Sequence, residues 1–200
     1  STMAIINRPK VLIADEPTTA LDVTTQKAIL ALISSLAVDL DLAVLLITHD
    51  MGVVWQAAQD VYVMHNGVIV EQGSVAQVFR HPSDDYTRML IDAVPRLRID
   101  EHAAGGERIT ESDAPGGGRH ITQVNDVAVS YKAGSFAVKD ISFDLVAGRT
   151  RALVGESGAG KTTIAKVISG QLAPTSGTVL IEGEDLAKAH GRRKREILKH

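Results

Sequence analysis

The stretch GESGAGKT at residues 155–162 decides the fold class, because it fits the phosphate-loop pattern G-x-x-x-x-G-K-[ST]. It follows TRALVG (150–155), which has the length and composition of a buried strand, and it opens a helix predicted over 161–171. A strand, a glycine-rich turn and a helix in this order are the context that distinguishes a phosphate loop from a chance match. We therefore expect an α/β fold with a mostly parallel sheet.

The chemistry of phosphate binding explains the composition of this loop. Glycines let the backbone curl so that successive N–H groups converge on one anion, and the following helix presents its positive N-terminal end. Lys161 would place its charge on the β- and γ-phosphates, and the Thr162 hydroxyl would bind Mg²⁺. The expected contacts of the loop come from Gly155, Ser157, Gly158, Ala159, Gly160, Lys161 and Thr162.

Two carboxylates close another apolar run far from the loop. VLIAD (11–15) reads as a parallel strand buried on both faces, and Glu16 follows Asp15 directly. In a site that hydrolyses phosphate bonds, the first carboxylate would hold hydrated Mg²⁺ and the second would orient and deprotonate the attacking water. Alone, such a pair is as easily surface charge, and His49 after the apolar run 42–48 is more often structural than catalytic.

The remaining pattern divides the chain into two α/β segments. In the first segment (1–95) we expect a helix over 23–38 capped by Asp22, a strand at 42–48, a helix at 51–58, a hairpin of 60–65 and 68–72 around Asn66-Gly67, and helices at 74–80 and 84–93. Residues 96–120 are rich in glycine and charge and are expected to be a linker. In the second segment (121–200), antiparallel strands are expected at 121–131 and 135–146, a further strand at 177–183, and helix after it.

Composition excludes several classes of protein. The 200 residues contain no cysteine, so disulfides, thiolate zinc sites and iron–sulfur clusters are ruled out. The net charge is −3 and provides no broad basic field, so no nucleic-acid partner is expected, and the basic run at 192–195 is interpreted as a solvated helix face. No apolar run approaches the roughly 20 residues needed to span a bilayer, so any membrane role would act through partners.

Together these motifs resemble one family. VLIADEPTTALD (11–22) followed by LLITHD (45–50) closely resembles the Walker B, D-loop and switch-histidine series of ABC ATPases, and GESGAGKTT matches the same family. The resemblance implies ATP and Mg²⁺ as cofactors and assigns the following roles. Asp15 is the Mg²⁺-water ligand, Glu16 the catalytic base, Asp22 the D-loop aspartate, His49 the switch histidine, Thr163 a further phosphate contact, and Tyr131 the aromatic that stacks on adenine.

A second resemblance indicates the branch of the family. TTALDVTTQ (18–26) and HPSDDYTRMLIDAVP (81–95) look like the oligopeptide and dipeptide importer branch, whose catalytic domain carries such a tail. The resemblance implies ATP binding and hydrolysis that drive import of peptides or a related small solute. It also implies a peripheral place at the cytoplasmic face of the membrane, held by integral permease subunits. A second ABC ATPase domain, in cis or in trans, and indirectly a solute-binding protein are the other expected partners.

The order of the motifs is unusual, because Asp15 precedes Lys161 whereas in an ABC ATPase the phosphate loop comes first. The simplest interpretation is a tandem protein. In that case the first segment is the back half of one domain, the second segment is the front half of the next, and no site in the chain is complete. The LSGGQ-like signature would lie upstream of Ser1. The alternative is a circularly permuted core, with VLIAD beside TRALVG and Asp15 near the phosphate loop; the linker is long enough for this.

Two other functions remain open at this point. One is a soluble, non-transport ABC ATPase that acts on ribosomes or DNA, against which the tail and the lack of a basic surface argue. The other is a non-catalytic chain that only binds nucleotide.

Overall fold

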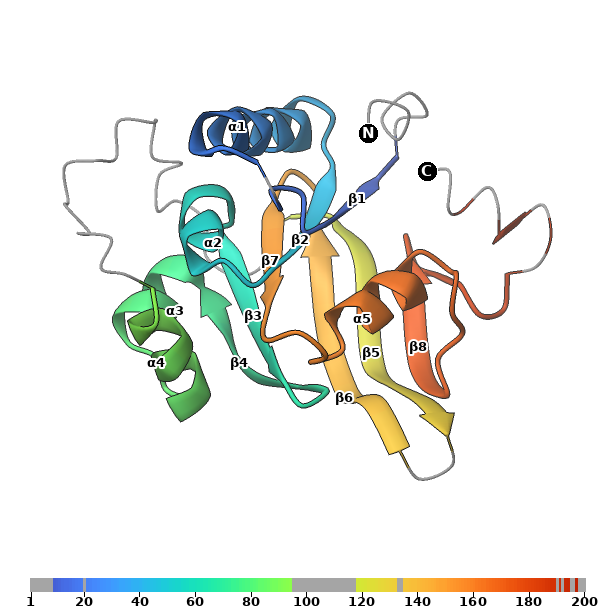
Figure 1. The fold of residues 1–200 in the computed structure, drawn as a ribbon. Helices are drawn as coiled ribbons and strands as arrows, with labels where there is room; N and C mark the ends of the chain where they lie inside the picture. The colour runs from blue at the N-terminus through green and yellow to red at the C-terminus, as the bar shows by residue number, and fades with distance from the viewer. Residues whose placement is uncertain are drawn as a thin grey trace.

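A computed structural model describes residues 9–19, 21–94, 118–132, 135–189, 191, 193, 194 and 197, and arranges them around two sheets (Figure 1). The first sheet has the strand order β1-β2-β7-β3-β4, in which every pairing is parallel except that of β3 with β4. Its strands are β1 (Val11–Asp15), β2 (Ala43–Thr48), β3 (Asp60–His65), β4 (Val68–Ser74) and β7 (Thr150–Val154). The expected α/β fold with a mostly parallel sheet is thus confirmed.

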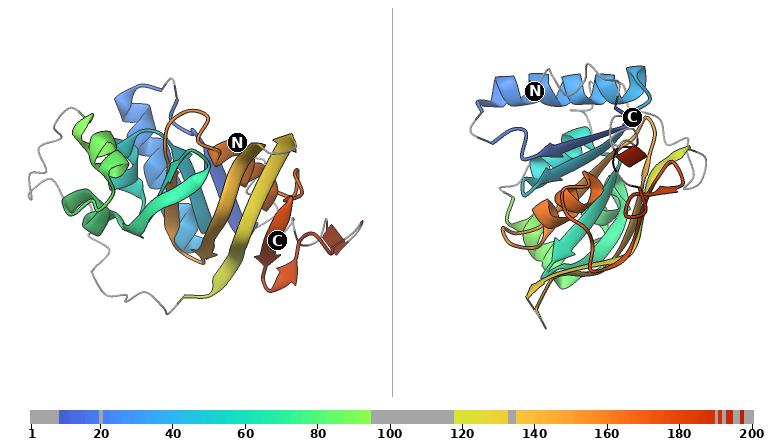
Figure 2. Two further views of the ribbon diagram at one scale, coloured as in Figure 1. Left: turned by 90° about the horizontal axis from the view of Figure 1, so that it is seen from below. Right: turned by 90° about the vertical axis from the view of Figure 1, so that its right-hand side faces the viewer.

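The second sheet is antiparallel and comes from the second segment, except that its first strand begins one residue earlier, at His120, the last residue of the expected linker. Its order is β6-β5-β8-β9, built from β5 (His120–Lys132), β6 (Ser135–Val146), β8 (Ser176–Ile181) and the short β9 (Glu184–Asp185). In both views of Figure 2 this sheet, yellow to red, lies on one side of the molecule, away from the blue helix α1 (Val23–Asp39). The antiparallel part predicted for the second half is therefore present.

Five helices complete the described part of the chain. They are α1 (Val23–Asp39), α2 (Met51–Ala57), α3 (Val75–Arg80), α4 (Asp85–Asp92) and α5 (Lys161–Ile168). Asp22 caps α1 as predicted, accepting hydrogen bonds from the backbone N–H groups of Thr24 and Thr25. The helix expected to reach residue 171 ends three residues earlier, because Gly170 adopts a left-handed backbone with φ of 69°.

The feature that positions the site is the place of β7. This strand of the second segment lies between two strands of the first, with Leu153 opposite both Ile47 of β2 and Tyr62 of β3 (Figure 1). The chain therefore has the arrangement of the permuted core in the structure. One detail of that hypothesis was wrong: VLIAD (β1) does not lie beside TRALVG, because β2 pairs with both strands and separates them.

The alternation of side chains along β7 joins the two segments in one core. Leu153 faces the cluster that contains α5 and the antiparallel sheet, whereas Ala152 and Val154 face the cluster formed by α2, α3 and their strands. All three side chains are completely buried. By contrast, β1 is only half-buried at the edge of the sheet, so the expectation of a strand buried on both faces was wrong for VLIAD.

Charged pairs also connect the segments at the surface. Lys10 Nζ lies 2.5 Å from the Glu182 carboxylate, and Arg119 contacts both Asp41, at 2.9 Å, and Glu182, at 3.1 Å. Each of these side chains is partly exposed, so each pair adds little stability by itself. The pairs matter because each one places side by side two residues that lie far apart in the sequence.

The tail that begins after α3 is fastened to β4 by a buried carboxylate. Glu71 accepts hydrogen bonds from the backbone N–H of Ser83 at 2.8 Å, from its hydroxyl at 2.8 Å, and from the N–H of Asp84 at 3.1 Å. Burial raises the pKa of Glu71, but these hydrogen bonds outweigh it, so the pKa lies below its ordinary value of 4.5. The ionised carboxylate thereby fixes the start of α4.

We expect Glu71→Gln to lower the free energy of unfolding at neutral pH by about 1–3 kcal/mol, because an amide N–H₂ would face the Asp84 N–H donor. A lowered native pKa stabilises the fold above the unfolded-state value of 4.5, and this contribution is lost as the pH falls through the native pKa. The difference from wild type should therefore shrink below pH 4.5 in urea titrations. A difference that is constant across this pH range would contradict the role given to the carboxylate.

Candidate nucleotide site

The phosphate loop connects β7 to α5 and needs glycine at two positions for steric reasons. Gly155 has a φ of 152°, and a Cβ atom on it would lie 2.1 Å from the carbonyl oxygen of Met64 in β3. Gly160 has a φ of 103°, and a Cβ atom on it would lie 2.5 Å from Val138 Cγ1. Both positions also have backbone angles that side chains rarely adopt. The glycines thus allow the loop to lie directly against β3 and β6.

Lys161 begins α5 and folds back into the loop. Its side chain is buried, and its Nζ donates hydrogen bonds to the carbonyl oxygens of Gly155 at 2.7 Å and Glu156 at 2.9 Å. Burial lowers the pKa of Lys161, although the nearby charges of Glu16 and Asp15 oppose this shift. The ammonium group is therefore held in the centre of the loop, beside helix N–H groups that have no partner within the helix.

The carboxylate end of β1 reaches this loop from the first segment. Asp15 Oδ2 accepts a hydrogen bond from the Thr162 hydroxyl across 3.3 Å, although 147 positions separate the two residues. This contact follows from the sheet order, because parallel strands present their carboxyl ends at the same edge. The structure thus brings Asp15 beside the predicted Mg²⁺ ligand Thr162.

Glu16 and His49 form a hydrogen-bonded pair at the ends of β1 and β2. His49 Nδ1 lies 2.7 Å from Glu16 Oε1, and Thr19 donates its hydroxyl proton to Oε2 at 2.9 Å. A carboxylate can only accept, so the proton of this bond belongs to Nδ1 of His49. Burial raises the pKa of Glu16, but the bonds from His49 and Thr19 outweigh it and lower the pKa below 4.5. Glu16 is therefore ionised at neutral pH.

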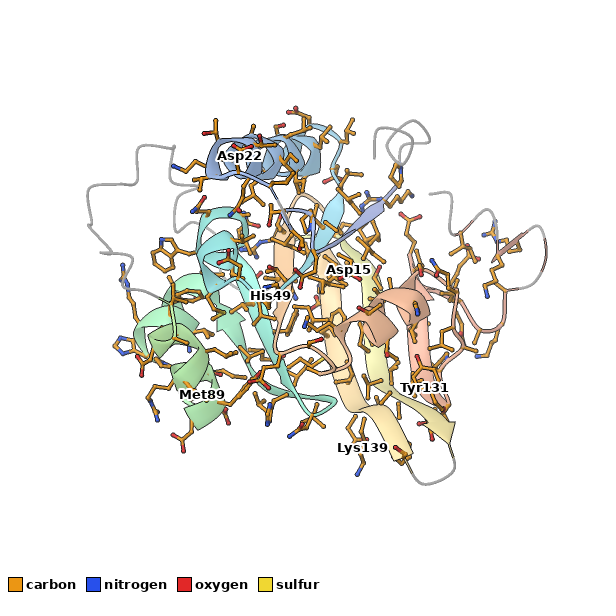
Figure 3. All side chains as sticks on the ribbon, viewed as in Figure 1. Asp15, Asp22, His49, Met89, Tyr131 and Lys139 are labelled. Atoms are coloured by element: carbon orange, nitrogen blue, oxygen red, sulfur yellow. The ribbon has the colours of Figure 1, made fainter. Side chains whose placement is uncertain are left out.

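Tyr131 approaches the loop from β5. Its side chain is 61% exposed, and its hydroxyl lies 3.4 Å from that of Thr163 on α5. An exposed aromatic ring beside the first turn of this helix has an open face on which a base could stack. Figure 3 shows Tyr131 on β5.

The predicted D-loop aspartate has a different position from the other site residues. Asp22 lies at the start of α1, whereas Asp15 and His49 lie in the middle of the molecule (Figure 3). Its carboxylate is engaged by the helix it caps, with Thr25 Oγ1 at 2.7 Å from Oδ2. Those hydrogen bonds lower the pKa of Asp22 below its ordinary value of 3.8. Within the described residues, the structure does not bring Asp22 into contact with the loop.

Two contacts of the loop were missed in the sequence. The Gly67 N–H donates to the carbonyl of Ala159 at 3.1 Å, and the Glu156 N–H donates to the hydroxyl of Tyr86 at 3.0 Å. Gly67 was recognised as a hairpin residue and Tyr86 as part of the tail. Neither signal could reveal the contact, because it depends on where β7 enters the sheet. The phosphate loop is thus braced by the first segment on two sides.

The oxygen donors present fit a magnesium ion that is bound mainly through phosphate. Mg²⁺ usually takes one or two protein oxygens and completes its shell with water and substrate phosphates. The Thr162 hydroxyl and the Asp15 carboxylate supply such oxygens side by side. Among the described residues no cluster of three or more His, Cys, Asp or Glu could hold a metal by itself. Asp15 and Thr162 are therefore suited to a shared ion.

A parallel sheet whose β7 leads through a glycine-rich loop into α5, with carboxylates at the same edge, defines a P-loop nucleotide-binding fold. Two parts of the sequence match family models. Residues 138–200 match the family described as ABC transporter, and residues 70–122 match the one described as oligopeptide/dipeptide transporter, C-terminal region. The two matched stretches are thus similar to the family and to the branch that the motifs predicted.

Individual relatives agree with these matches. The chain is 41% identical over 207 residues to the glutathione import ATP-binding protein GsiA of Salmonella typhimurium, covering 91% of this chain and 33% of the relative. It is 38% identical over 213 residues to GsiA of Pectobacterium atrosepticum, covering 94% of this chain and 34% of the relative. The chain therefore spans about one third of the length of the curated relatives it matches.

Among solved structures, the chain is similar to cbiO1 of Clostridium perfringens, part of the ABC transporter complex cbiONQ. The TM-score is 0.36 at 28% identity, covering 40% of this chain and 31% of that one. A bacterial Atm1-family ABC exporter with ATP bound gives a TM-score of 0.36 at 30% identity, covering 44% of this chain and 15% of that one. None of the described helices of this chain is long and apolar enough to cross a membrane.

Proposed function

We propose that this chain binds ATP and Mg²⁺ at the phosphate loop and belongs to an ATPase that drives import of peptides or a related small solute. The observation that carries the proposal is the convergence of Asp15 on Thr162, at 3.3 Å, at the start of a helix with a phosphate-loop sequence. The matches to ABC transporter sequence support the same function. The import of glutathione, itself a tripeptide, by the named relatives supports a peptide-like solute.

Each site residue has a proposed role. The loop from Gly155 to Thr163 cradles the phosphates through its backbone N–H groups, and Lys161 turns from its two carbonyl acceptors toward the β- and γ-phosphates. Asp15 and Thr162 hold Mg²⁺, which neutralises phosphate charge when bound. The exposed ring of Tyr131 stacks on adenine.

The hydrolytic step rests on Glu16 and His49. The ionised carboxylate of Glu16 orients a water molecule and accepts its proton, which a lowered pKa makes possible at neutral pH. His49 donates the hydrogen bond of its Nδ1–H to Glu16. Its Nε2 can donate to the γ-phosphate, the proposed second partner, when both ring nitrogens carry a proton. The pair thereby connects Glu16, which accepts the proton of the water molecule, to the γ-phosphate, which the water attacks.

The tandem arrangement remains our proposal for the longer protein. One alignment of 207 residues covers 91% of this chain and 33% of a single relative, so nearly the whole chain resembles part of one longer protein, which supports a junction between two domains. In such a protein, Asp15, Glu16 and His49 would serve an upstream loop in place of the loop at 155–163 that Asp15 reaches in this chain. Asp22 would reach across to the site containing Lys161. Permease subunits, a second ATPase domain, a solute-binding protein and a place at the cytoplasmic face of the membrane belong to the same proposal.

The second candidate function is nucleotide binding without hydrolysis. It is favoured because the carboxylates and the phosphate loop of the site come from different segments of a chain that spans one third of the length of its relatives. Both candidates require ATP binding at Lys161, and they differ in whether Glu16 activates a water molecule for ATP hydrolysis.

We expect Glu16→Gln to leave the Kd for Mg²⁺-ATP within about twofold of wild type and to lower any hydrolysis by about 10²–10⁴-fold, the usual contribution of a general base. Binding is measured by equilibrium titration and hydrolysis by phosphate release. Asp140→Asn, at an exposed carboxylate on β6, is the matched control and should change neither. A wild-type chain that does not bind ATP would refute the proposed function. Hydrolysis that is unchanged in Glu16→Gln would remove Glu16 from the mechanism.

A further inference from the structure

Tyr86 connects the tail to the phosphate loop. It lies on α4, within the residues that match the oligopeptide/dipeptide transporter C-terminal region, and its hydroxyl accepts the hydrogen bond of the Glu156 N–H at 3.0 Å. Its ring stacks on that of His65 at the end of β3, with centroids 4.0 Å apart and planes tilted by 36°. The ring is thus fixed on one side by His65, and the hydroxyl is directed to the loop.

The start of α4 is itself held firmly. Asp84 caps the helix and accepts the Tyr86 N–H at 2.9 Å, while Glu71 on β4 binds the N–H groups of Ser83 and Asp84. A continuous set of hydrogen bonds therefore runs from β4 through the helix cap to the phosphate loop. Tyr86 is positioned by this set, and its place does not depend on a flexible loop.

Residue 156 is held through both of its backbone polar groups. Its carbonyl accepts from Lys161 Nζ at 2.9 Å and from the Ala159 N–H at 3.2 Å, whereas its N–H donates to Tyr86. When Lys161 turns to a phosphate, the carbonyl loses its charged donor. The bond to Tyr86 and the bond from the Ala159 N–H then keep residue 156 in place, and of these two only the bond to Tyr86 comes from outside the loop.

We propose that Tyr86 is a positioning residue for the phosphate loop, through which the tail controls how well the loop binds nucleotide. This inference rests on the proposed function, since it takes the loop to be the nucleotide site. Binding at the loop and order in the tail are then coupled, and the coupling is reciprocal. A tail that is displaced by a partner would weaken nucleotide binding, and bound nucleotide would stabilise the tail.

The test uses Tyr86→Phe, which keeps the ring and its stacking on His65 but removes the hydroxyl. We expect faster amide hydrogen exchange over 155–160 without nucleotide, and a Kd for Mg²⁺-ATP raised by about 2- to 10-fold, the effect of one lost hydrogen bond. Met89→Ala, at an exposed position on the same helix, should change neither quantity (Figure 3). In the wild-type chain, ATP should slow amide exchange over 84–92.

Three results would overturn the proposal. They are exchange over 155–160 that is unchanged in Tyr86→Phe, an unchanged Kd, or a wild-type tail whose exchange does not respond to ATP. The first of these is measured without nucleotide, so it decides the contact even if the chain proves not to bind ATP. If the wild-type chain does not bind ATP but Tyr86→Phe exchanges faster, the proposed function is refuted and the contact between Tyr86 and the loop is still supported.

Discussion

Replacing Lys161 by alanine is expected to raise the Kd for Mg²⁺-ATP by about 10- to 150-fold. The substitution removes a charge-assisted contact to phosphate worth about 1.5–3 kcal/mol. In the nucleotide-free chain the same ammonium group binds the carbonyls of Gly155 and Glu156, so its removal also loosens the loop. Both effects act in the same direction, against binding.

Two variants separate the charge from the rest of the side chain and from the helix. Lys166→Ala removes an exposed lysine from the same helix and should leave the Kd unchanged. Lys161→Arg keeps the charge on a larger, planar group in a buried position, so it should recover only part of the affinity. An unchanged Kd in Lys161→Ala would remove this loop from the nucleotide site.

Replacing Leu153 by alanine is expected to lower the free energy of unfolding by about 2–5 kcal/mol, as for other fully buried leucines. Leu153 lies on β7, between two strands of the first segment, and packs in the cluster that contains α5. The cavity would therefore weaken both segments at once. Because the core is shared, the loss of stability should be measurable in the first segment, far from the substitution.

The single tryptophan provides the readout. Trp55 lies on α2 in the first segment, with its ring centroid 5.3 Å from that of Phe79, whereas the substitution is in the second. We expect its fluorescence transition in urea to shift with Leu153→Ala and to coincide with the loss of helical circular dichroism. Phe136→Ala, at a half-exposed position of β6, should shift it little. A Trp55 transition that is unaffected by Leu153→Ala would mean that the segments fold independently.

Local structure was largely predictable from the sequence, because it depends on short-range patterns. An apolar run located β2, alternation of polar and apolar residues located β6, the Asn66-Gly67 pair located the hairpin, and Asp22 marked the start of α1. The partner of each strand was harder to predict. Nothing within VLIAD indicates that it pairs with 43–48 and not with 150–154, since parallel pairing joins residues that lie far apart in the chain.

The candidate site shows the same division. The phosphate-loop pattern around Lys161 was predicted from residue type and context. The roles of Asp15 and Glu16 were predicted from the resemblance to ABC ATPases, since alone the pair is as easily surface charge. The hydrogen bonds of Gly67 and Tyr86 to the loop were not evident, because an ordinary hairpin and an ordinary tail helix carry the same residues. Such contacts depend on the sheet order and become visible only in three dimensions.

The central claim is that the two segments of this chain fold together into one sheet with one site, and carbodiimide cross-linking tests it directly. The reagent joins an amine to a carboxylate without a spacer, and Lys10 Nζ lies 2.5 Å from the carboxylate of Glu182. We predict a Lys10–Glu182 peptide link in the monomeric chain, identified by mass spectrometry and absent from Lys10→Arg. A monomer without this link, or a link found only in cross-linked dimers, would contradict the account.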